Sequence, residues 1–580
     1  MEALSPNNKS ADSLAGQAAP QVVPWHVLVL TATCLLLFLL GTNSLSLADP
    51  EEARCGLIVR DMLEHGHWLM PHLEGKPYFD KPAPFFWLAA AGVSLTGSRE
   101  LGGRLIPALA GLLAVLVTFA FARRVFRSSA AGLLAGLVLA TSGEFFFMAR
   151  WYRMDMPFIA AMWAAVWWFW RSEDRRLRGE HYSKAKAWLG FYLFAGVATL
   201  FKGPAGLGLP CLALLSYFLL SRQYRRIAEL LSLPGIAAYF LVAAPWYVAV
   251  SLTEPGYASE FFLRQNIARF TGAADMGHKW PGILYVPIII AGMLPWSIFL
   301  PAIAVRYFPR RWKSRNDSPA LSFLWLCALV WLVFFAFSGT KLASYVLPVF
   351  PPLAVLVGGL VASWIASSQT DTLMKLAART MLVTVALLPA VPLTMELWLH
   401  AADAWLVVPF GIAATGFVAM LFALKRRRRG QFAGLGAGVV ASMFVYLILH
   451  TAPAGYRQMS TRDLVRGVDA SALRAGRFGF CPNSKSSFLL YAGMEDAPIF
   501  HVAGDGNSDS LVEWLRSCRP VWCLVSGQKH LSQLRQACPG GFRIVAAEGS
   551  CWLITNDNVA SAAATSTGAA TSASARKGVR

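Results

Sequence analysis

The chain consists largely of long apolar runs that are separated by short polar segments. Most of these runs approach the roughly 20 residues that an α-helix needs to cross the hydrocarbon core of a bilayer. The pattern predicts thirteen membrane-spanning helices, at residues 25–45, 101–122, 130–149, 156–171, 187–201, 205–221, 231–252, 283–305, 319–338, 344–365, 379–399, 403–424 and 431–451. We therefore expect an all-α polytopic membrane domain over residues 25–451, after an N-terminal tail at 1–24.

A further apolar run at 83–97 has about 15 residues, fewer than the roughly 17 needed to cross the hydrocarbon core. If this run does not span the membrane, the basic segments between the other runs all fall on one side. These segments are Arg123, Arg124 and Arg127, residues 171–186, Arg222, Arg225 and Arg226, residues 306–315, Lys375, and residues 425–429. Because basic loops stay in the cytoplasm, the N-terminus is predicted to be cytoplasmic, and 83–97 to be an interfacial helix on the outer face.

The first outer loop, residues 46–100, contains a second predicted surface helix at 49–65. Asp49 is expected to be its N-cap, with Pro50 in the first helical position and Glu52 completing a capping box. Apolar residues recur at helical spacing in this segment, at Cys55, Ile58, Val59 and Met62. The loop is therefore predicted to form two helices that lie on the outer membrane surface.

Residues 452–557, after the last predicted span, have a different pattern. Strand-like runs at 478–481, 521–525, 542–545 and 552–555 alternate with helix-like runs at 511–518 and 531–538. This alternation predicts a small α/β domain. An odd number of spans places it outside the cytoplasm, in the periplasm of a Gram-negative cell. The last segment, 558–580, is rich in Ala, Ser, Thr and Gly and is expected to be disordered.

Composition agrees with this membrane architecture. Of the 580 residues, 56% are hydrophobic and only 14% are charged, which excludes an ordinary soluble globular protein. The formal net charge of +20 would suit nucleic-acid binding, but the basic residues lie in short clusters between apolar runs. Membrane topology explains this distribution better, so no nucleic-acid partner is expected.

Five of the nine cysteines follow the last predicted span: Cys481, Cys518, Cys523, Cys538 and Cys551. In an oxidising compartment they would allow two disulfides and one free thiol. None of the cysteines has C-x-x-C spacing, so a structural zinc site is not expected.

The segment from Glu74 to Trp87 carries polar chemistry directly into an aromatic run. Three prolines in this segment restrict the backbone, so Asp80 and Lys81 should be presented from a stiff loop. The alternative interpretation is a solvated connection before the next helix.

The predicted topology brings many unusual polar residues to the outer face. They are Glu51, Asp80 and Lys81 in the first outer loop, Arg150, Arg153 and Asp155 in the second, Lys202 in the third, Arg264, Asn266, Arg269 and His278 in the fourth, and Lys341 and Tyr345 in the fifth. Basic residues on the outer side contradict the usual charge distribution, so each suggests an anionic partner.

Acids close to several Lys and Arg residues suit a ligand with a sugar and a phosphate. Cations bind phosphate and stabilise the charge on a departing phosphate, while carboxylates bind sugar hydroxyls or an amine or act as a general base. The phosphate or lipid-donor candidates are Lys81, Lys202, Arg264, Arg269, Lys341 and Tyr345, and the catalytic candidates are Glu51, Asp80 and Asp155. Binding of lipid headgroups is the alternative role for Arg150 and Arg269.

Cofactor chemistry is less clearly indicated. His278, or His65 and His67 with Glu64, offer ligands for a divalent metal, although loop histidines are more often simply solvated. The sequence lacks the P-loop, dinucleotide-binding and H-E-x-x-H motifs, so nucleotide use is not expected. A donor that is available outside the cytoplasm without a nucleotide points to a lipid carrier.

Six ordered motifs resemble the bacterial branch of the protein O-mannosyltransferase-like superfamily, and within it the lipid A aminoarabinose transferases. The motifs are Pro50 to Arg54 (PEEAR), Lys76 to Pro82 (KPYFDKP), Arg104 to Gly111 (RLIPALAG), Arg153 to Asp155 (RMD), Phe201 to Gly203 (FKG), and Lys341 with Tyr345 and Pro348 to Pro351 (PVFP). The resemblance covers about residues 30–450.

The resemblance implies a glycosyltransferase C fold, an undecaprenyl phosphate-linked sugar donor and the phosphate of lipid A as acceptor. Glu51 occupies the place of a first-loop acid that is usually aspartate, and Asp80 a place often held by glutamate. Lys81, Asp155, Lys202 and Tyr345 match the family without change. Because an acceptor phosphate is already ionised, Glu51 is assigned first to positioning the sugar, its amine or a metal, and His278 is the second candidate metal ligand.

The leading hypothesis is a monomeric enzyme of the bacterial inner membrane, with its active site facing the periplasm. It would transfer 4-amino-4-deoxy-L-arabinose from undecaprenyl phosphate to lipid A and so give resistance to polymyxin and other cationic peptides. A second hypothesis keeps the fold but has a protein or glycan hydroxyl as acceptor. A transporter of lipids or sugar phosphates is the third hypothesis. Transporters usually place charges at the bilayer midplane and often contain internal repeats, whereas here the charges lie at the outer ends and no repeat is found.

Overall fold

The computed structural model describes residues 23–273, 279–309, 318–369, 371–469, 473, 476–502, 511–516 and 521–556. The chain divides into two compact units. The first comprises Met1–Ser44, Val59–His72 and Pro77–Thr451, and the second comprises Leu45–Ile58, Leu73–Lys76 and Ala452–Arg580.

The first unit is helical. Its α-helices are α2 (Pro24–Leu39), α4 (Pro84–Thr96), α5 (Arg99–Phe126), α6 (Ser129–Ala140), α7 (Gly143–Arg150), α8 (Asp155–Leu177), α9 (Lys184–Lys202), α10 (Ala205–Leu220), α11 (Leu233–Thr253), α12 (Arg269–Thr271), α13 (Tyr285–Gly292), α14 (Leu300–Tyr307), α15 (Pro319–Ala336), α16 (Phe350–Ala366), α17 (Thr372–Leu387), α18 (Ala390–Trp398), α19 (Val407–Lys425) and α20 (Arg429–Tyr446). Short 3₁₀ or π segments complete it: η1 (Tyr224–Leu231), η2 (Ser259–Ala268), η3 (Gly282–Leu284), η4 (Trp296–Phe299), η5 (Ala343–Val349), η6 (Ala404–Leu406) and η7 (Leu447–Thr451).

Each run predicted to span the membrane overlaps helix in this unit. Within the described residues, seven helices are long and apolar enough to cross a bilayer, or up to nine if each of two bent pairs is one span. The run at 83–97 forms the short helix α4. The chain is therefore a polytopic helical protein. The length and hydropathy of the helices do not by themselves set the number of spans.

Two of the predicted spans are bent. Helices α6 and α7 meet at 67°, and the helical segments Gly282–Gly292 and Trp296–Tyr307 meet at 110°. The helices in the predicted spans at 130–149 and 283–305 are therefore each interrupted by a bend. At the first bend the hydroxyls of Thr141 and Ser142 donate to carbonyls four residues back, which competes with the helical ladder. At the second bend Pro295 interrupts the helix.

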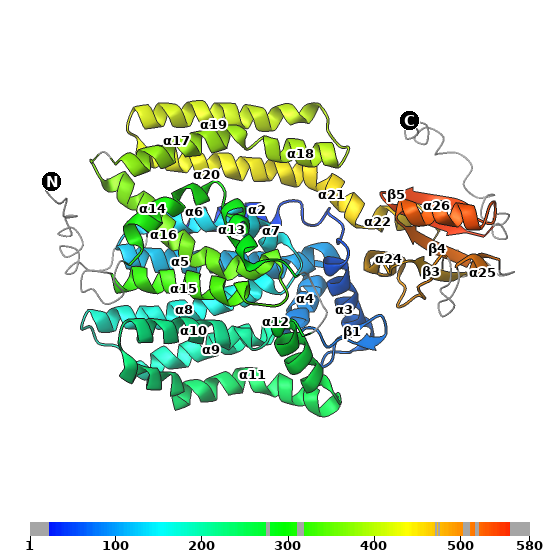
Figure 1. Ribbon diagram of the computed structural model, residues 1–580, viewed down its shortest axis with the longest axis horizontal. Helices are drawn as coiled ribbons and strands as arrows, with labels where there is room; N and C mark the ends of the chain where they lie inside the picture. Colours follow the sequence, from blue (N-terminus) through cyan, green and yellow to red (C-terminus); the bar gives the residue numbers. More distant parts are fainter. Residues whose placement is uncertain are drawn as a thin grey trace. The chain divides into compact units, whose positions relative to one another are not determined.

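Helices of the first unit pack in groups. Figure 1 shows α8, α9 and α11 together at one side of this unit, and α17, α19 and α20 together at the other. In the interior, the indole N–H of Trp163 donates to Thr118 Oγ1 at 3.0 Å, and that of Trp331 to the Leu209 carbonyl at 2.9 Å. These bonds satisfy the indole N–H groups of two large buried tryptophans and join α8 to α5 and α15 to α10.

Polar networks occupy both ends of α8. Asp155 is its first residue, whereas Glu173 and Asp174 lie near its other end. Arg226 pairs with Glu173 at 2.8 Å, and Arg124 pairs with Asp174 at 2.5 Å. At 1.5 Å per residue, the 18 residues from Asp155 to Glu173 span about 27 Å, close to the thickness of a bilayer's hydrocarbon core. The apolar length of α8 thus separates two charged layers.

The second unit contains a four-stranded sheet in the order β3-β4-β6-β5. Its elements are α21 (Ala452–Met459), α22 (Arg462–Arg466), β3 (Arg477–Cys481), α24 (Ser486–Ala492), α25 (Leu511–Leu515), β4 (Val521–Ser526), α26 (Gln528–Ala537), β5 (Arg543–Glu548) and β6 (Cys551–Thr555). Strand β3 is parallel to β4, and β6 is antiparallel to β4 and β5. Each strand overlaps one of the four runs in which strands were predicted.

The beginning of α3 (Glu51–His65) differs from the predicted capping box. The carboxylate of Asp49 accepts hydrogen bonds from the backbone N–H and the hydroxyl of Ser487, so it does not cap the helix. Glu52 is buried and accepts from the N–H of Ala48 at 3.1 Å. The predicted N-cap is therefore wrong, because a partner more than 400 residues away takes its carboxylate.

After α3 the chain forms a small hairpin of β1 (His72–Leu73) and β2 (Lys76–Pro77). Its two-residue turn has positive φ at Glu74 and Gly75, as a type I′ turn requires.

No disulfide forms among the eight cysteines that the structure describes. Four of the five cysteines of the C-terminal segment are free thiols, namely Cys481, Cys523, Cys538 and Cys551, and Cys518 lies outside the described residues. The two disulfides that the composition would allow are therefore absent from this structure.

Candidate functional site

A buried ion pair joins the facing ends of α8 and α9. Lys202 Nζ lies 2.5 Å from Asp155 Oδ1, although the two residues are 47 positions apart. Asp155 begins α8 and Lys202 ends α9, so each charge also lies at the helix end that favours it. Gly203 then ends α9 at φ 77° and ψ −156°, a conformation that essentially only glycine adopts. The Lys-Gly-Pro turn thus holds Lys202 against Asp155.

Arg153 provides a second cation for the same carboxylate. Its Nε lies 3.2 Å from Asp155 Oδ2, so each oxygen of Asp155 has a cationic partner. Asp155 is 1% exposed. A carboxylate held between two cations is better suited to fixing those cations than to removing a proton. The sequence pattern placed Arg153 on the outer face and in the Arg-Met-Asp motif but gave it no specific role, for which its spacing of two from the acid was the available signal.

Lys81 lies in the same electrostatic cluster. Burial is the largest cause that lowers the pKa of its ammonium group, from 10.5 to about 8. The nearby charge of Asp80 raises this pKa, and the charges of Arg269, Lys202 and Arg153 contribute to the decrease. Lys81 also donates to the backbone carbonyl of Asp80 at 3.1 Å. An anionic ligand beside this buried ammonium and its cationic neighbours would favour the charged form of Lys81.

Tyr345 and Phe158 provide aromatic faces to Lys202. The ammonium nitrogen of Lys202 lies 5.2 Å from the ring centre of Tyr345 and 5.3 Å from that of Phe158. Lys341, which is buried, donates to the carbonyl of Ser338 at 2.6 Å. The structure therefore brings Tyr345 to the cluster and places Lys341 in the turn before it.

An aromatic group lies beside the Asp80 loop. Tyr257 contacts Phe79 with ring centres 5.8 Å apart and stacks on Phe261 at 5.5 Å. The hydroxyl of Tyr257 and Nε of Arg269 are buried and have no hydrogen-bond partner among the described residues. Leaving a buried donor unsatisfied costs about 1–3 kcal/mol, so these atoms favour a polar ligand next to the loop.

Three predicted site residues are not part of this cluster as described. Arg264 has a side chain that is 63% exposed and pairs with Glu260 at 3.2 Å. Glu51 belongs to the second unit, where it pairs with Arg54 at 3.8 Å. His278 lies outside the described residues.

Two other arginines have structural partners. Arg150 donates to the carbonyls of Leu37 and Leu40 at 2.6 and 2.8 Å, and Arg104 to the carbonyl of Thr42 at 2.8 Å. These are carbonyls at and just beyond the C-terminal end of α2, which lack intrahelical donors. Arg150 therefore stabilises a helix end from within the bundle.

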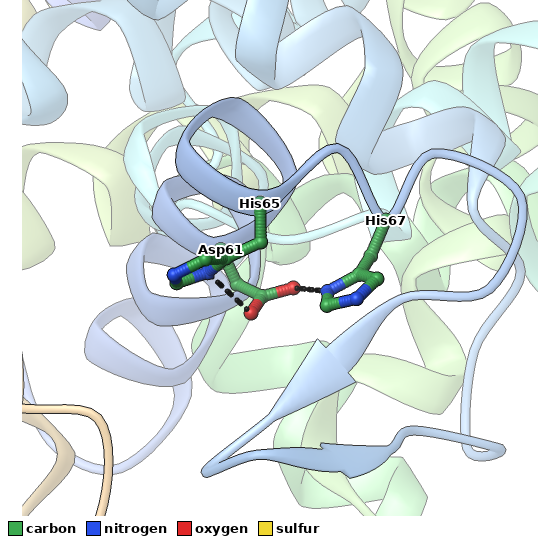
Figure 2. Close-up of side chains that lie close together, drawn as sticks. All are labelled: Asp61, His65 and His67. Carbon is green, nitrogen blue, oxygen red and sulfur yellow. Dashed lines mark hydrogen bonds and ion pairs between the residues drawn. The ribbon is translucent and has the colours of Figure 1, made fainter.

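The histidines of the first outer loop lie next to a different acid from the one predicted. His65 and His67 both contact Asp61, as Figure 2 shows, whereas Glu64 pairs with Arg60 at 3.8 Å. The grouping of His65 and His67 with Glu64 is therefore wrong, because on a helix the position four residues before His65 faces it.

Four residues of the cluster region lie in the part of the chain that is similar to a known glycosyltransferase family. Residues 80–248 match the family described as dolichyl-phosphate-mannose-protein mannosyltransferase, and this range includes Asp80, Lys81, Asp155 and Lys202. The undecaprenyl phosphate-α-4-amino-4-deoxy-L-arabinose arabinosyl transferase of Pseudomonas aeruginosa (strain UCBPP-PA14) is 33% identical over 326 residues, which cover 56% of this chain and 57% of that protein. Transferase 1 of Pseudomonas fluorescens (strain Pf0-1) is 29% identical over 368 residues, 62% of each chain.

Over this range the chain is similar in sequence to these aminoarabinose transferases. The matches span about three fifths of the curated relatives' length. The crystal structure of ArnT from Cupriavidus metallidurans bound to undecaprenyl phosphate has a TM-score of 0.74 and 22% identity to this chain, with coverage of 93% of this chain and 99% of ArnT. The apo state of that ArnT has a TM-score of 0.73. This likeness establishes the polytopic glycosyltransferase C fold that the sequence predicted.

Proposed function

We propose that this chain transfers 4-amino-4-deoxy-L-arabinose from undecaprenyl phosphate to a phosphate of lipid A at the periplasmic face of the bacterial inner membrane. The observation that carries this proposal is the cluster of Lys81, Arg153 and Lys202 around Asp155, with Arg269 coupled to Lys81. The names of its sequence relatives specify the donor, and a protein of the same fold has been solved with undecaprenyl phosphate. Attachment of an aminosugar would mask negative charge on lipid A and thereby give resistance to polymyxin and other cationic peptides.

The proposed reaction needs little proton chemistry. An oxygen of the lipid A phosphate attacks the anomeric carbon, the bond from that carbon to the phosphate oxygen of the donor breaks, and undecaprenyl phosphate leaves as an anion. Because the attacking phosphate is already ionised, no general base is required. Lys81, Lys202 and Arg269 would bind the donor phosphate and stabilise the charge that develops on it.

The acids have different proposed roles. Asp155 fixes Lys202 and Arg153, while Asp80 and Glu51 are assigned to the sugar hydroxyls or to its amine. Tyr345 would orient Lys202, and Lys341 would support the turn before Tyr345. Arg264 is retained as a candidate for donor headgroup contacts on the exposed surface.

The proposed topology has thirteen spans, with the cluster near Asp155 outside the cytoplasm and the basic layer at the other end of α8 inside it. The sheet-containing segment 452–557 would then be a periplasmic α/β domain, and the protein would act as a monomer. A short α4 beside the Asp80 loop suits a helix at the membrane interface, since it has 13 residues.

Mass spectrometry of lipid A tests the substrate assignment. Cells that express the chain should carry a lipid A species heavier by one aminopentose, and cells without it should not. Variants Lys81→Ala and Lys202→Ala should lose this species while the protein remains in the membrane. Lys186→Ala, at the opposite end of α9, is the matched control and should retain it. Absence of the aminopentose species in cells with the intact chain contradicts the proposal.

A hydroxyl acceptor is the second candidate, and it makes a different prediction for the acids. A hydroxyl must lose a proton on attack, so Glu51→Gln would abolish transfer while donor binding survives. With a phosphate acceptor, Glu51→Gln should mainly weaken recognition of the sugar. A transporter is less well supported, because the charged cluster lies at the ends of α8 and α9 and not along their middle.

A further inference from the structure

Asp61, His65 and His67 form a compact group at the end of α3. Asp61 and His65 lie four residues apart, on one face of the last helical turns. Gly66 follows with φ 75°, and this turn brings His67 back toward the same face. Figure 2 shows the carboxylate of Asp61 between the two imidazole rings.

The distances within this group suit a shared ion. Asp61 Oδ1 lies 3.1 Å from His65 Nδ1, and Asp61 Oδ2 lies 2.8 Å from His67 Nδ1. One donor atom from each residue lies within 4.8 Å of the other two. Ligands in a tetrahedral zinc site are about 3.3 Å apart, given metal–ligand distances near 2.05 Å. Small side-chain rotations would therefore bring the three donors to binding distance.

The donor set and the exposure of the group also indicate a metal. Two imidazoles and one carboxylate are typical ligands of first-row divalent transition ions, and three protein ligands leave room for water. Side chains of His65 and His67 are 41% and 42% exposed, so an ion and its water can reach them. Asp61 is 20% exposed, which leaves its carboxylate partly desolvated.

Neighbouring contacts hold this group in place. His72 stacks on His67 with ring centres 3.9 Å apart and bonds through Nδ1 to the Met70 carbonyl at 3.0 Å. The carbonyls of Trp68 and Leu69 accept from the indole N–H groups of α4 and α11, at 2.7 and 3.1 Å. The segment after His67 is thus fixed to α4, which follows the Asp80 loop, and to α11.

We propose that Asp61, His65 and His67 bind one divalent first-row transition metal ion, such as Zn²⁺, with water completing the coordination. The ion fixes the end of α3 to segment 66–72, and so stabilises the approach to the loop that carries Asp80 and Lys81. This site goes beyond the proposed transfer reaction, which uses none of its three ligands. The alternative is a carboxylate that only accepts hydrogen bonds from two imidazoles.

Metal binding to the full-length chain tests the proposal directly. The protein, purified without a histidine tag, reconstituted in nanodiscs and treated with chelator, is titrated with Co²⁺ and Zn²⁺. One Co²⁺ should bind per chain with visible d–d absorption, and Zn²⁺ should displace it. His65→Ala, His67→Ala and Asp61→Asn should each weaken binding at least about 10-fold.

Two controls separate this site from general surface binding. Glu64→Gln removes a neighbouring acid that pairs with Arg60, and His181→Ala removes an exposed loop histidine. Both should bind Co²⁺ as the unmodified chain does. Zn²⁺ should also raise the melting temperature of the unmodified chain but not that of Asp61→Asn. This difference would show that the ion binds the folded site.

Three results would overturn the proposal: no stoichiometric binding by the unmodified chain, binding that survives all three ligand substitutions, or an equal effect of Glu64→Gln and Asp61→Asn. If His65→Ala or His67→Ala does not fold, the variants His65→Gln and His67→Gln replace them. Loss of binding in these folded variants supports the site, and retained binding leaves only the hydrogen-bonded cluster.

Discussion

Each carboxylate oxygen of Asp155 forms an ion pair, one with Lys202 and the other with Arg153. The charge of Lys81 also interacts with this carboxylate. With Arg269 coupled to Lys81, the described cluster has more positive than negative charge. Like charges that are held together in a partly buried site repel one another, so the ligand-free state is less favourable than the state with an anion bound. At the scale of single residues, the excess positive charge favours an anion, as the proposed phosphate-linked donor requires.

Replacing Lys202 should separate the effects of charge on catalysis and on folding. Lys202→Ala should lower transfer by about 10²-fold or more, because a positioned cation on developing charge is lost. The melting temperature should fall as well, since Asp155 loses one of its two partners in a buried site. Both quantities are measured in proteoliposomes, with Lys186→Ala as control. Transfer within a factor of two of the unmodified chain would contradict the assignment of Lys202.

The lowered pKa of Lys81 predicts an alkaline limit on donor binding. Below about pH 8 the ammonium is protonated and binds phosphate, and above this pH the charge is lost. The KM for the donor should therefore rise as the pH increases through about 8. Lys81→Arg should remove this limit, because a guanidinium stays protonated. An alkaline limb that is the same in Lys81→Arg and the unmodified chain would assign the titration to another group.

The same pKa has the opposite consequence for the ligand-free fold. Between pH 8 and 10.5 the unfolded chain binds the Lys81 proton more tightly than the folded chain does. The contribution of Lys81 to stability therefore increases as the pH rises through this range. Donor binding reverses the preference by favouring the charged form, so binding at about pH 8.5 should take up protons, which calorimetry in buffers of different ionisation enthalpy measures.

At the scale of elements, close helix contacts position the loops that carry the charges. Gly92 of α4 and Gly102 of α5 touch through their backbones, and a Cβ on Gly102 would lie 2.4 Å from the N atom of Val93. The Asp80 loop leads directly into α4. The contact between these two glycines therefore fixes the helix that follows Asp80 and Lys81.

Gly102→Ala should destabilise the α4–α5 contact. The added methyl group meets backbone atoms, which cannot move aside as a side chain can, and overpacking of this kind costs about 1–3 kcal/mol. Gly208→Ala in α10 is the matched control, because a Cβ there meets nothing within 4 Å and alanine favours a helix by up to about 1 kcal/mol. Thermal unfolding in nanodiscs should show a lower melting temperature for Gly102→Ala only. Equal melting temperatures for the two variants would indicate that α4 and α5 can separate at no cost.

At the scale of the whole membrane unit, charges form two layers at opposite ends of α8. Asp155 and Lys202 lie in one layer, and Glu173 with Arg226 in the other. An ion pair is costly in hydrocarbon, so both layers should lie at or near the membrane surfaces. The separation of about 27 Å along α8 agrees with that position.

Labelling of exposed positions tests this topology. Arg264→Cys and Lys184→Cys replace side chains that are 63% and 57% exposed in the two proposed outer and inner layers. A membrane-impermeant maleimide should label Arg264→Cys in intact spheroplasts and Lys184→Cys only after permeabilisation. The unmodified chain is the control for its native cysteines. Labelling of both variants from the same side would contradict the two-layer topology and the outward-facing site.

Much of the element-level structure was predictable from local sequence. Apolar runs of membrane length coincide with helices, and the short run at 83–97 forms α4. Charged residues next to glycine and proline at helix ends are enough to identify Lys202 and the Asp80 loop as candidates. These signals are local, because helix propensity, run length and turn chemistry depend on residues within a few positions of one another.

Sequence alone determined where the helices form and which ionisable residues lie at their ends, since an apolar segment must satisfy its own backbone in a membrane. Only the tertiary structure decided the partners of those residues. In the tertiary structure Lys202 pairs with Asp155, and Arg150 binds carbonyls at the end of α2. The carboxylate of Asp49 binds Ser487, and that of Asp61 lies between His65 and His67. The physical reason is that a side-chain contact depends on the rotation, bend and packing of whole elements, whereas a helix is specified by the residues along it.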